Sequence, residues 1–255
     1  MEETTDRPTY EPEPNHQTPG QPSAQLNSMQ RLWMMYTAPG AVFGDIRVKP
    51  TWAICMVLIV ALSVVAQMMI LPHLDAEATL RARLGDRATE MTDEEIEQIV
   101  ERTEKFTKYS PLIGIVAGPI FWVILAAIFF VLLKIVGSDV DFVKSLATTL
   151  HAYWPASVVQ LVLTSILVQR MGVMPQEDLA NIVKSHLGAF LSPDAPAWLS
   201  AAASTINIFN IWTVVLLIIG FATVGKISRG RAAVVALVPW VVWLVGKVGV
   251  AALFS

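Results

Sequence analysis

The sequence predicts an all-α fold, a bundle of five transmembrane helices whose polar connections carry two or three amphipathic helices. Hydrophobic residues make up 54% of the chain and charged residues 15%, whereas an average soluble domain has roughly 25% charged residues. Five apolar stretches, none with an Asp or a Glu, are each close to the roughly 20 residues that a helix needs to cross about 30 Å of hydrocarbon. Helices are expected because a chain in lipid must satisfy its backbone hydrogen bonds within itself. The predicted spans are residues 51–71, 111–133, 146–168, 206–224 and 232–254.

The chain before the first span has two parts. Residues 1–28 are rich in proline and polar side chains and bury too little apolar surface to offset the entropy of ordering, so we expect a disordered tail ahead of one membrane domain, residues 29–255. A proline-rich peptide ligand is the alternative interpretation of this tail. Within residues 29–50 we expect one or two amphipathic turns, capped by Ser28 and stopped before Pro39, that lie in the membrane interface. The side chains that predict these turns are Leu32, Trp33, Met35 and Tyr36.

The first long connection, residues 73–110, predicts an amphipathic helix. Thr92 is followed three residues later by Glu95, which is the pattern of a capping box. Apolar side chains then recur at helical spacing. Pro111 is expected to end this helix or to begin the next one, and we expect the helix to be solvated and to lie over the bundle.

The connection after the third predicted span contains the most regular helical stripe of the chain. Pro175 fits the first turn of a helix, and Glu177 and Asp178 complement the positive end of its dipole. The sequence therefore predicts a second amphipathic helix, with His186 partly buried or interfacial on its apolar face. The stripe consists of Leu179, Ile182, Val183, His186, Leu187 and Phe190.

Basic residues flank the short connections and set the expected orientation. They precede the first span, bracket the second connection and fill the fourth, which places these three segments on one side of a five-span protein. The positive-inside rule makes that side cytoplasmic, so we expect the N-terminus inside and the C-terminus outside. The basic residues are Arg31, Arg47, Lys49, Lys134, Lys144, Lys226, Arg229 and Arg231.

The sequence contains no recognised catalytic or nucleotide-binding motif, and its histidines are too widely spread to predict a metal site. We therefore expect no catalytic, cofactor-binding or metal-binding residues. Asp139 and Asp141 could bind a cation together, although polar residues are also typical of a turn. His151 and Lys247 are the ionisable residues inside spans, and we expect both to be structural because no span contains a carboxylate to pair with them. A net charge of −3 gives no reason to expect a nucleic-acid partner.

Small residues and prolines inside the spans predict devices for helix packing. Gly114 and Gly118 form a GxxxG motif, which lets two helix backbones approach closely. Pro119, Pro155 and Pro239 would kink three of the spans. Kinks combined with polar residues could instead line a cavity, and this is the basis for the alternative interpretation of the chain as a small permease or channel subunit.

Three passages of the sequence together resemble the Yip-domain family of five-span membrane proteins. They lie at residues 38–52, before the first span; at residues 135–155, from a small-residue turn to an aromatic–proline pair; and at residues 207–232, which link spans four and five. Their order and the matching number of spans extend the resemblance over residues 37–254. The motif positions, for which the resemblance implies a structural or interaction role, are Pro39, Phe43, Ile46, Pro50, Trp52, Gly137, Phe142, Tyr153, Pro155, Phe209, Trp212 and Gly220.

The resemblance implies a non-enzymatic membrane scaffold or adaptor, acting in membrane organisation or trafficking. Eukaryotic members of the family lie in the Golgi and the endoplasmic reticulum, bind small GTPases and help to shape or sort transport membranes. They carry a D-L-x-G-P-L-like motif before the first span, where this chain reads DIRVKP at residues 45–50. This departure argues against GTPase binding and favours a bacterial member in the cytoplasmic membrane. The expected partners are then the lipid bilayer and an unknown protein, which can be a second copy of the chain.

Overall fold

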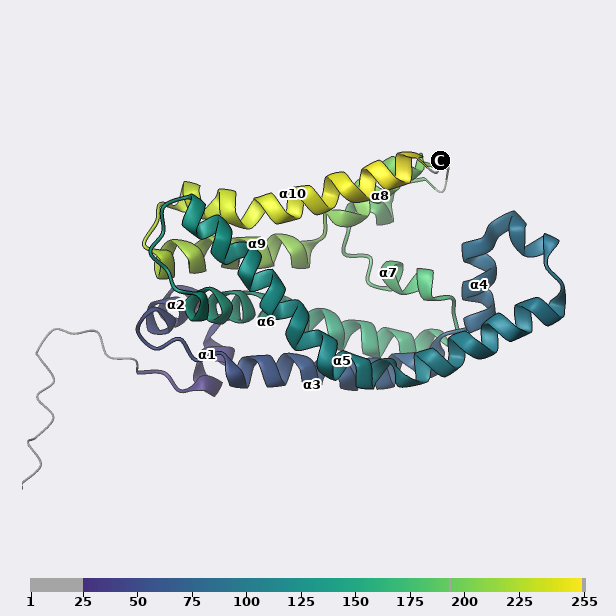
Figure 1. Ribbon diagram of the computed structural model, residues 1–255, viewed down its shortest axis with the longest axis horizontal. Coiled ribbons are helices and arrows are strands. Elements are labelled where there is room, and N and C mark those ends of the chain that lie inside the picture. Colours follow the sequence, from purple (N-terminus) through teal and green to yellow (C-terminus); the bar gives the residue numbers. More distant parts are fainter. Residues whose placement is uncertain (1–24, 193, 254–255) are drawn as a thin grey trace, which may run out of the picture.

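The computed structural model describes residues 25–192 and 194–253, and this part of the chain consists of helices and their connections (Figure 1). Five helices are long and apolar enough to cross a membrane, which confirms the predicted all-α bundle. The predicted tail at residues 1–28 lies mostly outside the described residues. The five long helices are α3 (Ala53–Ile70), α5 (Asp93–Ile135), α6 (Phe142–Met171), α9 (Ile208–Gly225) and α10 (Arg229–Leu253).

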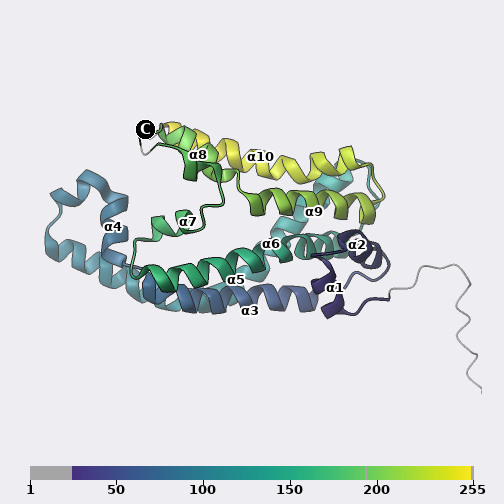
Figure 2. The same ribbon diagram turned by 180° about the vertical axis from the view of Figure 1, so that it is seen from behind.

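The long helices run alternately in opposite directions along the long axis of the molecule (Figure 1 and, from behind, Figure 2). One end, which we call the basic end, holds residues 25–52 and the short connections 136–141 and 226–228. The opposite end, which we call the loop end, holds the long connections 71–92 and 172–207. The three basic segments therefore lie together, as the distribution of basic residues predicts.

α5 has 43 residues and extends about 65 Å at 1.5 Å per residue. Its predicted capping box is confirmed, because the Thr92 hydroxyl accepts from the Glu95 amide at 3.3 Å and the Glu95 carboxylate accepts from the Thr92 amide at 2.9 Å. The expectation that a separate helix ends near Pro111 and lies over the bundle is wrong. Pro111 lies inside α5, where the carbonyl that it frees is at the edge of the apolar stretch and within reach of water. The amphipathic segment therefore projects from the bundle, and Phe106 on its stripe is 66% exposed.

The segment before the first span forms two helices, α1 (Ser28–Met34) and α2 (Pro39–Val48). The cap of α1 is Asn27 and not Ser28, because Asn27 exchanges hydrogen bonds of 2.8 and 2.9 Å with the third helical residue. Pro39 begins α2, where its missing N–H removes no helical hydrogen bond. α2 packs against α9 within the bundle. The buried residues of α2 are Val42, Phe43, Asp45 and Ile46.

At the loop end, the predicted amphipathic helix over residues 175–190 is wrong. The chain there forms η3 (Gln176–Asp178), which continues directly into α7 (Leu179–Ile182), and extended residues then lead to the single turn η4 (Leu187–Phe190). The remaining helices of this end are η1 (Leu71–His73), α4 (Ala76–Leu84), η2 (Gly85–Glu90) and α8 (Ala197–Thr205).

A competing backbone partner explains why the stripe does not form a helix. His186 is extended and makes an isolated antiparallel bridge with Asn207, just before α9. The Leu187 amide donates to the carbonyl of Ile206 and the Ile208 amide donates to the carbonyl of Ser185, each at 3.1 Å. These bonds give the backbone groups the hydrogen-bond partners that they would otherwise have found in a helix. The periodicity of the sequence does not reveal such partners.

The buried core lies nearer to the basic end than to the loop end. α9 is the most enclosed span, with 44% of its most apolar window buried, against 11% for α5 and for α10. α9 contacts α2, α6 and α10, while α5 crosses the bundle and contacts α3, α6 and α10. The outer helices present rows of exposed apolar side chains, as lipid-facing surfaces do.

Candidate functional site

A buried ion pair joins the two N-terminal helices at the basic end. The guanidinium of Arg31 in α1 contacts the carboxylate of Asp45 in α2 through Nη2 at 2.6 Å and through Nε at 2.7 Å. Further bonds surround the pair: Arg31 Nη1 donates to the Lys49 carbonyl at 2.8 Å and to the Thr51 hydroxyl, and Asp45 Oδ1 accepts from the Gln25 amide at 2.7 Å. Both side chains are less than a tenth exposed, so each depends on the other for its hydrogen bonds.

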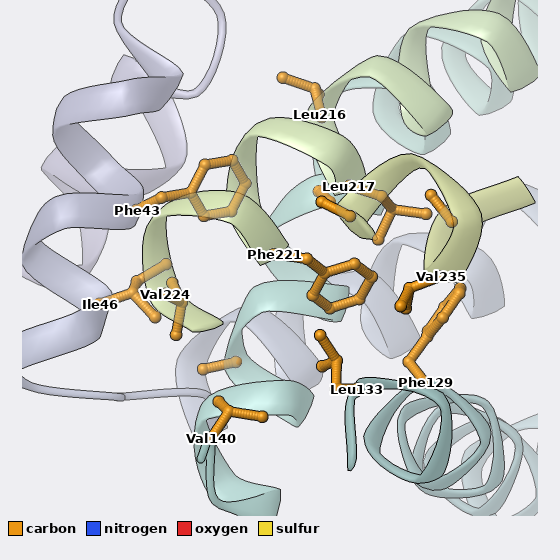
Figure 3. Close-up of a cluster of buried hydrophobic side chains, with 14 of the residues drawn as sticks. Phe43, Ile46, Phe129, Leu133, Val140, Leu216, Leu217, Phe221, Val224 and Val235 are labelled. Atoms are coloured by element: carbon orange, nitrogen blue, oxygen red, sulfur yellow. The ribbon is translucent and has the colours of Figure 1, made fainter. Parts of the chain in front are cut away.

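This ion pair holds the apolar face of α2 against α9. Figure 3 shows Phe43 directed toward α9, and it shows Phe221 of α9 among side chains from α5 and α10. The contact is close because Gly220 has no side chain. A Cβ there would lie 2.6 Å from Thr148 Cγ2 in α6 and 2.8 Å from the ring of Phe43. Gly220 is therefore the point at which α2, α6 and α9 meet.

The two short connections of the basic end are joined to each other. The Ser138 hydroxyl donates to the carbonyl of Gly225 at 2.9 Å, and a Cβ at Gly225 would lie 2.8 Å from that hydroxyl. Gly137 (φ +83°) and Lys226 (φ +53°) both have left-handed backbone, which ends α5 and α9 abruptly. Lys226 is the only non-glycine residue with positive φ in the described part of the chain. These features hold the connections 136–141 and 226–228 in fixed positions, and we call the surface that they form the platform.

A cavity of about 410 Å³ lies on this platform. Its charged lining comes from separate elements: Arg47 from the last turn of α2, Lys144 from the first turn of α6, Lys226 from the end of α9 and Asp139 from the second connection. Three cations and one carboxylate give the lining an excess of positive charge. The other lining residues are Gly137, Val140, Val224 and Gly225.

Asp141, which does not line the cavity, partly offsets this positive charge. Its carboxylate accepts from the Lys144 amide at 2.8 Å, which caps α6, and it pairs with the Lys144 ammonium at 2.7 Å. Desolvation alone would raise the pKa of Asp141, but the two bonds from Lys144 hold that pKa below its usual range. Arg47 and Lys226 are the cavity cations without such an ion pair among the described residues. The cavity therefore suits carboxylate or phosphate oxygens.

One motif residue of the family resemblance, Gly137, lines this cavity. Phe43 and Ile46 of α2 are fully buried, and Gly220 of α9 lies against the ring of Phe43. Pro39 begins α2, and the two remaining residues of the first passage, Pro50 and Trp52, connect α2 to α3.

The other motif residues lie in helix contacts away from the cavity. Phe142 meets Phe130, Tyr153 meets Trp122 and Trp212 meets Tyr36, with ring centroids 6.0, 5.1 and 6.0 Å apart. Two further motif residues, Pro155 in α6 and Phe209 in α9, are buried.

Gly114 and Gly118 of α5 face α3. A Cβ at Gly114 would lie 3.2 Å from the side-chain Nε2 of Gln67, and a Cβ at Gly118 would lie 3.4 Å from Cγ2 of Val60. Both glycines therefore belong to the contact between the first two spans, and neither lines the cavity at the basic end.

The two ionisable residues inside spans have neutral partners. His151 is buried, and its Nδ1 lies 2.8 Å from the carbonyl of Ala147, as expected for a histidine bonded within its own helix. Lys247 donates to the hydroxyl of Ser204 at 2.7 Å, a partner that sequence reasoning did not find. Neither residue lines the cavity at the basic end.

The sequence predicts that the basic segments lie on one side of the membrane, but it does not predict a site between them. Arg31 and Arg47 enter the sequence analysis only as orientation signals, and Asp45 only as part of a motif, so neither the ion pair nor the cavity is anticipated. The available signal is that Arg31 and Asp45 are opposite charges on two neighbouring apolar segments. Opposite charges in such a position are expected to pair when both segments are buried.

The fold and the site define an integral membrane protein with five candidate spans and a cationic cavity at the end of the bundle where the basic connections meet. In a comparison with protein families, residues 33–250 match the Yip1 domain, so the chain belongs to the Yip1 domain family. This match confirms the resemblance found in the sequence. Neither a comparison with curated proteins nor one with solved structures found a match.

Proposed function

We propose that the chain is a non-enzymatic scaffold or adaptor of the cytoplasmic membrane, and that its basic end binds an acidic segment of a protein partner. The observation that carries this proposal is the convergence of Arg47, Lys144 and Lys226 from three elements on one platform. A partner segment with carboxylate or phosphate groups fits this charge and the size of the cavity.

The rigidity of the platform supports a binding role. The ion pair between Arg31 and Asp45 fixes α2, and the bond between Ser138 and Gly225 fixes the connections. The cations are thus held apart at set positions, which lowers the entropy lost when a partner binds. The orientation that goes with this proposal has the basic end in the cytoplasm and the C-terminus outside, in accordance with the positive-inside rule.

The experiment is photocrosslinking in living cells from a benzoylphenylalanine placed at the exposed position Ser228. A discrete crosslinked protein is expected, and its yield should fall severalfold in the double variant Arg47→Gln, Lys226→Asn, because two cationic partners are removed. Asn is chosen at position 226 because it tolerates left-handed backbone.

The matched control is the double variant Arg102→Gln, Lys108→Gln, which removes the same charge from the exposed part of α5 at the loop end. Its crosslinking yield should equal that of the wild type. If the two double variants behave alike, or if the wild type gives no discrete product from position 228, the basic end is not the binding surface.

A further inference from the structure

A second cavity, of about 510 Å³, lies at the loop end between residues 181–192 and α8. Six of its ten lining residues have polar side chains, and none of the lining residues within the described part of the chain is a carboxylate. The lining residues with polar side chains are Asn181, Lys184, His186, Ser192, Ser200 and Ser204.

His186 is buried at the wall of this cavity without a hydrogen-bond partner. Its side chain is 6% exposed, and neither ring nitrogen is bonded to any residue that the structure describes. A buried polar group in this state costs about 1–3 kcal/mol of stability, which a structural role does not explain. A ligand in the cavity would supply the missing partner.

The backbone around His186 is arranged to hold the ring in place. The bridge to Asn207 fixes the position of the main chain. A Cβ at Gly188 would lie 2.9 Å from Nδ1 of His186 and 3.2 Å from the Ser204 amide nitrogen, so only glycine leaves the ring room. The imidazole of His186 therefore lies against Gly188, which in turn lies against the backbone of Ser204.

Two cations give the cavity a positive character. Lys184 is exposed at its edge, and Lys247 of α10 donates to the hydroxyl of Ser204 at 2.7 Å. The Ser204 hydroxyl donates in turn to the carbonyl of Ala201 at 3.0 Å. The nearest acid along the chain is Asp194, whose amide donates to the Ser192 hydroxyl at 3.4 Å and which does not line the cavity.

The two elements that line the cavity, η4 and α8, also carry exposed apolar side chains. In η4, Leu187 is 52% exposed and Phe190 is 83% exposed, while Trp198 in α8 is 47% exposed. Apolar and aromatic residues in such a position enter the boundary between headgroups and acyl chains. The cavity is thus positioned to receive a group that hangs from the membrane surface.

We propose that this cavity binds a phosphate group, presented by a phospholipid headgroup or free in solution. The cationic edge, the imidazole and the serine hydroxyls match the negative oxygens of phosphate. The apolar entrance favours the lipid as the source of this group. The proposal concerns the loop end and does not depend on partner binding at the basic end.

Native mass spectrometry of the full chain in detergent tests the proposal. The probes are dioleoyl phosphatidic acid and dioleoylglycerol, which have the same acyl chains and differ in the phosphate. The wild type should retain one molecule of the phosphatidic acid and release the dioleoylglycerol. Inorganic phosphate is then added at constant ionic strength: displacement of the lipid assigns the site to phosphate from either source, and retention assigns it to the lipid headgroup.

Two variants in the cavity and one outside it identify the residues. Lys184→Gln and His186→Leu should each weaken retention of the phosphatidic acid about tenfold, because each removes a donor to a charged oxygen. Lys108→Gln, an exposed lysine of α5 remote from the cavity, should leave retention unchanged. Equal retention by all three variants and the wild type, or equal retention of the two lipids, would overturn the proposal.

The stability of the His186 variant separates a binding role from a structural one. Because His186→Leu removes an unpaired buried polar group, the lipid-free variant should melt at or above the wild-type temperature while it loses the ligand. A large drop in the melting temperature would show that the histidine is structural. Lys184→Gln then still tests binding, since this exposed side chain is not part of the core.

Discussion

The basic end and the loop end of the bundle handle polar groups in opposite ways. At the basic end, the buried charges of Arg31 and Asp45 are paired, and the short connections are tied by the bond between Ser138 and Gly225. At the loop end, the connections are long, isolated bridges hold them, and His186 is buried without a partner.

This difference teaches where stability and binding are located. A polar group whose hydrogen bonds are made inside the protein contributes to a fixed shape, whereas one left unpaired is available to a ligand. The basic end therefore presents its charges from a rigid surface, and the loop end contains a buried imidazole without a hydrogen-bond partner among the described residues. The two ends are therefore expected to lie on opposite sides of the membrane and to differ in what a substitution costs.

The sidedness of the two ends gives the largest expected effect, because labelling is all or none. On a Cys55→Ser background, cysteines at Asp139 and Ser228 should react from one side of the membrane, and cysteines at Glu94 and Asn181 should react from the other. A membrane-impermeant maleimide added to intact cells and to inverted vesicles measures this. Equal labelling of positions 94 and 228 from the same side would refute the five-span arrangement.

The ion pair gives the next largest effect. Asp45→Asn should lower the free energy of unfolding by about 3–5 kcal/mol, because Arg31 would remain buried without its partner. Glu101→Gln breaks an exposed pair with Lys105 near the loop end and should leave the free energy of unfolding nearly unchanged, because water screens such a pair. Thermal unfolding in detergent compares the two. Equal losses would show that the pair at the basic end is not buried as described.

The contact at Gly220 gives a smaller effect. Gly220→Ala should destabilise the protein by about 1–3 kcal/mol, because the added Cβ overlaps Thr148 and Phe43. Gly246→Ala in α10 is the matched control, since no atom lies within 4 Å of a Cβ there. The control should be neutral or slightly stabilising, because alanine favours a helix more than glycine. A Gly220 variant that melts like the control would show that α2 does not press on α9.

The smallest expected effect concerns His151 and Lys247, and it tests the permease interpretation. His151→Gln and Lys247→Met should fold with at most about 1 kcal/mol of lost stability, the usual worth of one hydrogen bond. Neither variant should change ion or proton flux in reconstituted vesicles. Robust flux in the wild type that either variant abolishes would replace the scaffold proposal by a permease.

The five spans are predictable because lipid imposes a simple local condition, a continuous apolar run of sufficient length. The capping box of α5 is predictable for the same reason, since Thr92 and Glu95 are close in sequence. In contrast, residues 175–190 satisfy every local criterion for a helix and form none, because residues 185–187 bond to the start of α9. Pairing with a distant segment is not visible in periodicity.

The two sites were less predictable than the spans. Arg47 and Lys226 were recognised as basic residues, but a cavity depends on how α2 and α9 pack, and α2 itself was not expected in the core. His186 was recognised as a buried or interfacial residue, yet its missing partner can be seen only when its neighbours are placed. The sequence identifies these residues as unusual, but the packing of the helices decides which of them are in contact.

The length of α5 has a mechanical consequence. Its roughly 65 Å is about twice the thickness of the hydrocarbon layer, so a large part of the helix extends outside the membrane as a rigid rod. α4 packs against α5, and the C-terminal end of α5 lies inside the bundle, next to the bond between Ser138 and Gly225. Pro111 interrupts the helical hydrogen bonding where α5 leaves the apolar layer, so a sideways load on the exposed part bends the helix there first.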